Sequence, residues 1–271
     1  MVMARGLGAV VIVGGVIAAS AGCLLTSDFD GIAGTRSDAA APSVDSGIEA
    51  DAPEASAAFP CNPGEHLLCN NFDTGPIDNS GWVVGLTGLG SKAVLDTTFF
   101  HSPPAGFRST IGALVKGMNA GGILRQTPAI GTFKTLIYAF DMRVLSCASL
   151  GNGGSVTLAA MQPSGAVAFG VVLIDTNVYS FAQLDLTQGT FTPEPFTVAP
   201  KADTWQRVEI RLSLNASAAH AVVMLDANKV VDVDEVPGTP SPSILLNIGA
   251  NATGPISGCD VVYDNVTFDR Q

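Results

Sequence analysis

Two stretches of this chain alternate between apolar and polar side chains, and this period of two restricts the possible folds more than any other feature. In residues 132–147 large apolar side chains occupy every second position: Leu136, Tyr138, Phe140, Met142 and Val144. Residues 205–214 place Val208, Ile210, Leu212 and Leu214 on one side and Arg207, Glu209 and Arg211 on the other. Successive side chains of a strand point to opposite faces, so both stretches are predicted to be strands with one buried face.

Further short strands are predicted throughout residues 59–271, separated by clusters of Gly, Pro, Asn and Ser. They cover 67–72, 92–97, 107–114, 123–127, 155–162, 166–174, 178–186, 219–225, 229–233, 244–248 and 260–268. No long helical period interrupts them. We therefore expect residues 59–271 to form a single all-β domain, an antiparallel sandwich of two sheets.

The first 22 residues have the pattern of a secretory signal, with Arg5 followed by an apolar stretch over 6–21. Ser20, Ala21 and Gly22 precede Cys23, and this context resembles the cleavage site of bacterial lipoproteins, although Ser20 stands where those proteins usually carry an aliphatic residue. The resemblance implies cleavage after Gly22 and acylation of Cys23. Several acyl chains on Cys23 would anchor the protein durably to a lipid bilayer. An ordinary signal peptide with an incidental cysteine is the alternative.

Residues 23–58 are predicted to be a disordered tether between this anchor and the domain. From residue 28 on they are rich in Ala, Ser, Asp, Gly and Pro, and residues 24–58 carry seven acidic residues and one arginine. Such a segment repels itself and buries too little apolar surface to fold. The chain as a whole has a net charge of −11, which argues against binding to nucleic acid.

The domain contains four cysteines in addition to Cys23, an even number that suggests two disulfides in an exported protein. Three pairings are possible. We favour Cys61–Cys69, which would close a short loop at the start of the domain, and Cys147–Cys259, which would join the last strand to a central one. Zinc binding by these cysteines is the weaker alternative, because they form no CxxC pair.

The order of several short motifs resembles the concanavalin A-like and laminin-G-like jelly-roll domains. The motifs are Leu68-Cys69-Asn70-Asn71-Phe72-Asp73 at the start, Trp205-Gln206-Arg207-Val208-Glu209-Ile210 in the middle, the turn at Asp226-Ala227-Asn228, and Tyr263-Asp264-Asn265-Val266 at the end. The resemblance implies a jelly roll over most of residues 59–271. It does not select a function, because such domains include glycan-binding modules, glycoside hydrolases, lyases and adhesion domains.

Catalytic residues of a glycoside hydrolase are not recognisable in the domain. A jelly-roll glucanase resembling this chain would need the strand motif E-x-D-x-x-E, and its only match, Glu49 to Glu54, lies in the predicted tether beside Pro53. Asp232 and Asp234 share a face, but we interpret them as a charged strand end. The histidines His66, His101 and His220 show no metal-ligand spacing, and His101 is predicted to lie on the surface of a Pro-rich loop.

Asp73 and Asp264 are the candidate metal ligands. The alternation places Asp264 on one face with Val262, Val266 and Phe268, and Asp73 on one face with Leu67 and Cys69. A carboxylate among apolar neighbours must be paired, hydrogen-bonded or metal-bound. The resemblance implies a structural Ca²⁺ between the first and last strands, to which Asp73 and Asp264 would contribute oxygens. The alternative is that each carboxylate accepts backbone N–H bonds.

Together these features predict an exported lipoprotein, held in a bacterial membrane by Cys23, that presents a binding module for glycans or another surface ligand. Leu24 rather than Asp follows Cys23, which favours the outer membrane or cell surface. Two alternatives stay open: a hydrolase or lyase with unplaced catalytic residues, and an adhesion protein with a protein partner. Paired acids in a groove would favour the enzyme, and a concave face with one or two aromatic side chains would favour glycan binding.

Overall fold

The computed structural model describes residues 59, 61–62, 64–73, 75, 77, 81–88, 90–131, 133–147, 153–174, 178–214, 219–235 and 243–271. The predicted signal, Cys23 and the whole predicted tether lie outside the described residues. Among the residues that the structure does describe, no helix is long and apolar enough to cross a membrane.

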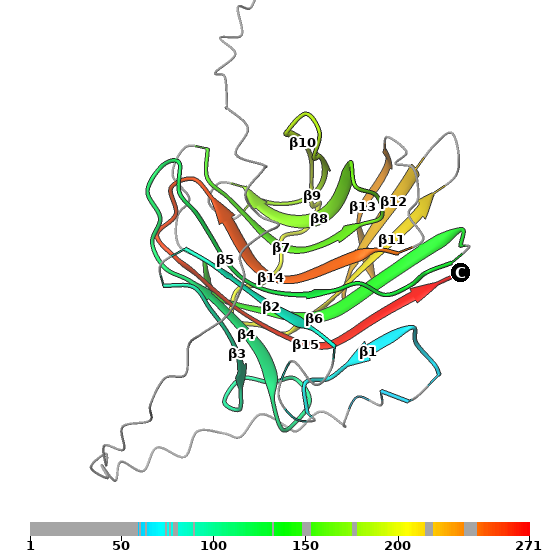
Figure 1. Ribbon diagram of the computed structural model, residues 1–271, viewed down its shortest axis with the longest axis horizontal. Coiled ribbons are helices and arrows are strands. Elements are labelled where there is room, and N and C mark those ends of the chain that lie inside the picture. The colour runs from blue at the N-terminus through cyan, green and yellow to red at the C-terminus, as the bar shows by residue number, and fades with distance from the viewer. Residues whose placement is uncertain are drawn as a thin grey trace, which may run out of the picture. The chain divides into compact units, whose positions relative to one another are not determined.

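The described residues form two antiparallel sheets that pack face to face (Figure 1). The larger sheet contains β13 (Asn228–Glu235), β12 (Ala219–Leu225), β11 (Gln206–Leu214), β6 (Thr135–Cys147), β15 (Cys259–Arg270), β4 (Gly106–Ile111) and β3 (Lys92–Asp96), in that order, with β1 (Leu68–Asn70) also paired to β15. The smaller sheet contains β10 (Thr190–Pro195), β9 (Val178–Asp185), β8 (Val167–Ile174), β7 (Ser155–Gln162), β14 (Leu245–Thr253), β5 (Asn119–Gln126) and β2 (Val83–Thr87). The chain passes repeatedly between the sheets, as in a jelly roll.

The prediction of an all-β sandwich is confirmed, and every strand expected from the sequence is present. Two further strands, β2 and β10, were not predicted. Gly85 interrupts the apolar pattern of β2, and β10 contains Pro193 and Pro195. Both strands lie at an edge of the smaller sheet, where glycine and proline are tolerated.

The core is formed by the alternate positions that the sequence predicted to point inward. In β6 and β11 these side chains are almost completely buried, among them Tyr138, Phe140, Val208 and Ile210. Two buried tyrosine hydroxyls cross from the larger to the smaller sheet. Tyr263 Oη donates to the carbonyl of Leu158 at 2.8 Å, and Tyr138 Oη donates to the carbonyl of Asn247 at 3.2 Å. These bonds satisfy the only polar atom of each tyrosine side chain and fix how the sheets sit on one another.

Two disulfides join the pairs favoured by the sequence, Cys61 with Cys69 and Cys147 with Cys259. Cys147 ends β6 and Cys259 begins β15, so the second bond joins two strands that are already neighbours in the larger sheet. Its two cysteines are 112 residues apart in the sequence, whereas Cys61 and Cys69 are 8 residues apart.

Loop length predicts that the two disulfides contribute unequally to stability. In the chain-entropy model, replacing Cys147 and Cys259 by Ala lowers the free energy of unfolding by about 5 kcal/mol, and replacing Cys61 and Cys69 lowers it by about 2.5 kcal/mol. Chemical denaturation of both double variants measures the difference. Equal losses would contradict this account of how the long loop is restrained.

Candidate functional site

The outer face of the smaller sheet is concave, because the ends of β7, β8 and β14 curve away from the larger sheet while their middle parts lie nearest to it (Figure 1). The side chains at the alternate positions of these strands point to the other side of the sheet and lie in the core. They include Leu124, Leu246, Met161, Phe169 and Phe181. Cross-strand pairing aligns the outward residues in rows across the sheet. The central row runs through Val83, Arg125, Asn247, Ala160, Gly170, Ala182 and Pro193.

A neighbouring row contains Thr87, Gly121, Asn251, Thr157, Val172, Ser180 and Pro195. On the other side of the central row, Phe191 of β10 lies opposite Leu184 of β9 and is 39% exposed, so one aromatic side chain stands at the rim of the face. The strands β8 and β9 contribute small, buried side chains. The accessible polar groups are concentrated on β5, β14 and β7, where they are an arginine, amides and a hydroxyl.

Arg125 and Asn247 are directly opposite each other on β5 and β14, and both are half-buried. In the described part of the chain, Arg125 makes no ion pair, and the side-chain oxygen of Asn247 is buried without a hydrogen-bond partner. Ser180, on the same face, also has a buried hydroxyl without a partner. Buried polar atoms without partners are uncommon and costly in folded proteins. Arg125 and Asn247 are therefore the side chains best placed to bind a polar ligand.

No carboxylate points outward from the described strands of the smaller sheet. Its acidic residues are Asp185 and Glu194. Asp185 ends β9 and accepts hydrogen bonds from Thr187 and Gln188 in the following turn. Glu194 is opposite Phe181, whose side chain is in the core, and so belongs to the other side of the sheet. This face lacks the pair of carboxylates that glycoside hydrolysis requires.

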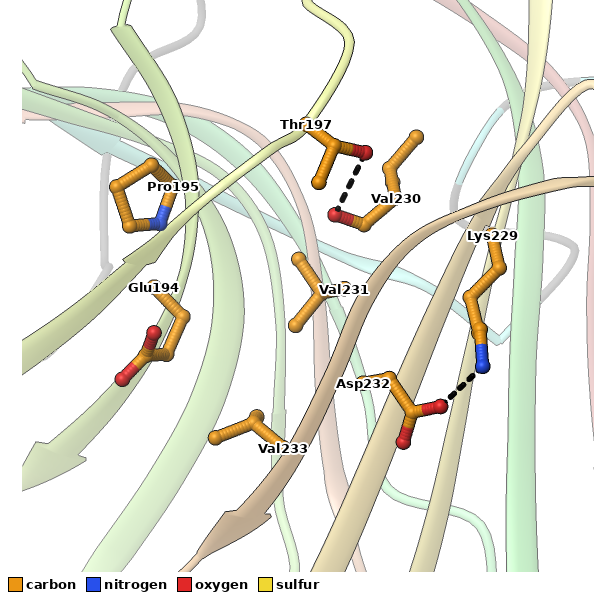
Figure 2. Close-up of a pocket in the computed structure, with 8 residues that line it drawn as sticks. All are labelled: Glu194, Pro195, Thr197, Lys229, Val230, Val231, Asp232 and Val233. Carbon is orange, nitrogen blue, oxygen red and sulfur yellow. Dashed lines mark hydrogen bonds and ion pairs between the residues drawn. The ribbon is translucent and has the colours of Figure 1, made fainter.

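A small pocket adjoins the rim of this face, where β10 approaches β13 (Figure 2). Its volume is about 310 Å³, and Val231 and Val233 form an apolar wall beside Glu194 and Pro195. Lys229 and Asp232 form an ion pair at its margin. Pro195 lies both in this pocket and in a row of the concave face, so the two surfaces are continuous.

Asp264 does not lie on the face that the alternation predicted, and this expectation is wrong for a local reason. Asn265 has a positive φ of 50°, and the pairing of β15 with β6 shifts register between Asp264 and Thr267. After this bulge, Val266 and Phe268 point into the core, whereas Asp264 lies on the opposite, outer side of the larger sheet. The side chain is nevertheless completely buried, because the loop that contains His101 and Ser102 covers it.

The hydrogen bonds of Asp264 do not fit a calcium ligand. One carboxylate oxygen accepts the backbone N–H groups of His101 and Ser102 at 2.8 and 2.7 Å, and the other accepts that of Asn265 at 2.8 Å. N–H dipoles aimed at both oxygens oppose a cation there. Burial raises the pKa of Asp264 to about 6, against the lowering effect of these N–H groups. The carboxylate thus plays the hydrogen-bonded role that the sequence left open.

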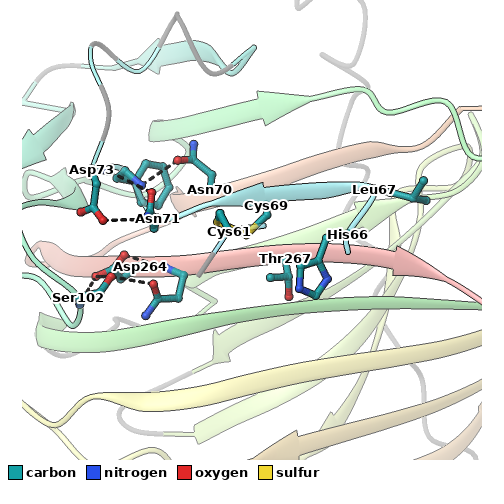
Figure 3. The surroundings of a disulfide bond; sticks show 12 residues. Cys61, His66, Leu67, Cys69, Asn70, Asn71, Asp73, Ser102, Asp264 and Thr267 are labelled. Carbon is teal, nitrogen blue, oxygen red and sulfur yellow. Dashed lines mark hydrogen bonds between the residues drawn. A yellow bond between two sulfur atoms is a disulfide. The ribbon is translucent and has the colours of Figure 1, made fainter. Parts of the chain in front are cut away.

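Asp73 is also engaged by hydrogen-bond donors (Figure 3). It lies beyond the end of β1, where Asn71 donates to one of its oxygens at 2.6 Å and the Ala105 N–H approaches the other at 3.5 Å. Burial raises its pKa. Across the described residues, no three His, Cys, Asp or Glu side chains form a group that could hold a metal ion. The N–H donors around Asp73 and Asp264 argue against the structural Ca²⁺ that the resemblance implied, and that Ca²⁺ site stays a prediction.

The sequence did not predict that His101 would be part of a buried polar network beside Asp264. His101 Nδ1 is 2.7 Å from Asp141, and the same Asp141 oxygen accepts from the Asn265 side chain at 2.7 Å. Arg207 contacts the other Asp141 oxygen at 3.2 Å. The His101 ring stacks on Trp205 with ring centroids 5.4 Å apart. Each of these groups is satisfied by another, so the network fastens the loop to the larger sheet.

Most of the remaining residues named in the sequence analysis contact other side chains of the domain. Asp232 and Asp234 both form ion pairs with His220, and His66 forms one with Asp269. Three further aromatic side chains are also packed against neighbours: Tyr179 and Tyr263 are buried, and Phe99 lies under the guanidinium groups of Arg108 and Arg143. Glu49, Asp51 and Glu54 lie outside the described residues. Sequence reasoning overlooked Arg125 and Asn247. Asn247 is a single polar residue inside an apolar run, and Arg125 directly follows the apolar residues Ile123 and Leu124.

Comparison with known proteins identifies the fold and nothing narrower. No protein-family model matches the sequence, and no curated protein matches it. Among solved structures, "Cellulose induced protein, Cip1" is similar over 75% of this chain and 97% of that chain, with a TM-score of 0.52 and 14% identity. A GlcNAcα1-4Gal-releasing endo-β-galactosidase from Clostridium perfringens is similar over 78% of this chain and 64% of that chain, with a TM-score of 0.50 and 9% identity. The fold is a concanavalin A-like jelly roll.

The His101–Asp141 contact predicts a titration that can be measured directly. The hydrogen bond to Asp141 raises the pKa of His101 above 6.5, although burial lowers it. A raised histidine pKa stabilises the folded state fully below pH 6.5, and this contribution is lost as the pH rises through the folded pKa. We expect the His101 ring resonances in an NMR titration to show a midpoint above 6.5.

The Asp141→Asn variant is the matched control for this titration. Without the carboxylate, the His101 midpoint should move down, and the loss of stability across this pH range should become smaller. His101→Asn identifies the resonance by its disappearance. A midpoint that does not change in Asp141→Asn would contradict the pairing.

Proposed function

We propose that this jelly-roll domain binds a glycan on the concave outer face of the smaller sheet and does not cleave it. The observation that carries the proposal is the chemistry of that face. Arg125 and Asn247 lie side by side, and among the described residues Arg125 has no ion pair, the side-chain oxygen of Asn247 has no hydrogen-bond partner, and no strand carboxylate points outward beside them. Amide and guanidinium groups donate and accept the hydrogen bonds that sugar hydroxyls offer. Phe191 at the rim adds a ring on which a sugar C–H face can stack.

Asn251, Thr157 and Gln162 extend the polar surface along β14 and β7, on either side of Asn247 and Ala160. A ligand that followed the central row would pass from Arg125 toward Phe191 and the pocket at Pro195. The small side chains of Ala160, Gly170 and Ala182 leave its path free of bulky groups. This arrangement favours a chain of several sugar units over a single monosaccharide.

The proposal extends to how the module is displayed. Acylation of Cys23 would hold the protein at a bacterial outer membrane or cell surface, and the acidic segment 24–58 would keep the domain 59–271 at a distance from the lipid. This part of the proposal is supported by the sequence pattern around Cys23 and by the composition of the segment. Metabolic labelling with a radioactive fatty acid tests it, because a Cys23→Ser variant should take up no label.

A glycan array tests the binding proposal, with the chain produced as Cys23→Ser so that lipid does not interfere. We expect binding to at least one polysaccharide. The variants Arg125→Ala and Asn247→Ala should each weaken it about tenfold, which corresponds to the loss of one well-formed hydrogen bond of about 1.4 kcal/mol. Arg211→Ala is the matched control, since Arg211 lies on the outer face of the larger sheet, where Glu209 is its partner.

The same samples test the absence of cleavage. Incubation of the bound polysaccharide with the protein should release no new reducing ends. Release of reducing ends by wild type but not by Asn247→Ala would contradict the proposal and favour a hydrolase or lyase. Equal binding by wild type, Arg125→Ala and Asn247→Ala would show that the binding site does not lie on this face.

A further inference from the structure

The edge strand β2 exposes an apolar surface. Val83, Val84 and Leu86 are 65%, 40% and 51% exposed, and β5 is the described strand with which β2 pairs. Among the described strands, none pairs with the other edge of β2, so the backbone N–H and C=O groups of that edge have no strand partner there. Residues 81–90 contain no charged side chain, in a chain whose net charge is −11.

The other sheet edges in the described structure carry features that discourage pairing with another strand. β13 bears Lys229, Asp232 and Asp234, and β3 bears Lys92 and Asp96. β10 contains Pro193, Glu194 and Pro195, and β1 is only 3 residues long. Charges, prolines and short strands are the common means by which proteins protect edges. β2 bears no charge and no proline, which distinguishes it from these edges.

We propose that β2 pairs antiparallel with β2 of a second copy of this chain. The strand is complementary to itself about Gly85: in this register Gly85 lies opposite Gly85, Val84 opposite Leu86, and Val83 opposite Thr87. Every facing pair is uncharged, so two acidic molecules can meet here without like charges opposing each other. The apolar side chains that are now exposed would be buried in the pair.

This pairing has a geometric consequence for the concave face. Identical antiparallel edge strands are related by a two-fold axis perpendicular to the sheet, so the smaller sheets of both copies continue into one another with the same face outward. The two concave faces would then open toward the same side. If the proposed glycan site is correct, the pair binds one polysaccharide at two sites, which increases the apparent affinity without any new contact.

Analytical ultracentrifugation of the chain carrying Cys23→Ser tests the pairing without any glycan. At about 100 μM, a self-association with a micromolar dissociation constant is almost fully formed, and we expect a dimer. Leu86→Lys places a charge on the edge and should weaken the dimer at least tenfold. Val198→Lys is the matched control, because Val198 is 59% exposed outside any strand and should leave the dimer unchanged.

A cysteine at position 85 tests the register. Gly85→Cys should form a dimer through a disulfide under mild oxidation, since residues directly opposite in an antiparallel pair have Cβ atoms about 4.5–5.5 Å apart. Val94→Cys, on the edge strand β3, should not. A wild-type protein that is monomeric at all concentrations, or a dimer that Leu86→Lys leaves unchanged, would overturn this inference. Neither result would affect glycan binding by the monomer, so the two proposals fail separately.

Discussion

The packing of the two inner faces against each other determines what every other surface of this domain can present. Half of the side chains of each central strand are committed to this core, and the hydroxyl groups of Tyr138 and Tyr263 join the two sheets across it. Because a strand alternates, the chemistry that is left for binding lies at the outward positions. The two outer faces then differ sharply in the residues that occupy them.

The charged side chains on the outer face of the larger sheet pair with one another. Asp141 is shared by His101, Arg207 and Asn265, and Arg108 binds both Asp96 and Asp260. Burial alone would raise the pKa of Asp141, but its hydrogen bonds and the nearby cations hold this pKa below the usual range. By contrast, in the described strands of the smaller sheet the concave face carries an arginine without an ion pair, amide groups and no outward carboxylate. This difference between the two outer faces is the basis of the proposed glycan binding.

Much of the fold could be predicted from the period-two pattern, as in β6 and β11, because apolar and polar residues alternate in the sequence of a half-buried strand. The pattern failed where the backbone departs from a regular strand. At Asn265 a positive φ produces a bulge, and this single residue separates Asp264 from Val266 and Phe268, which the alternation had placed on the same face. The strands β2 and β10 were missed because edge strands tolerate Gly85 and Pro193. Arg125 and Asn247 could not be paired from sequence alone, since their contact depends on which of β5, β7 and β14 are neighbours.

The most direct test of the account is to follow the NMR chemical shifts of the domain while a polysaccharide selected on the array is added. The account predicts that the backbone and side-chain amides of β5, β7 and β14 shift, with the Asn247 side-chain amide among the most affected, and that the outer face of the larger sheet remains unperturbed. Shifts confined to the network around His101 and Trp205, or to the ion pairs of β12 and β13, would contradict it and place the binding site on the other sheet.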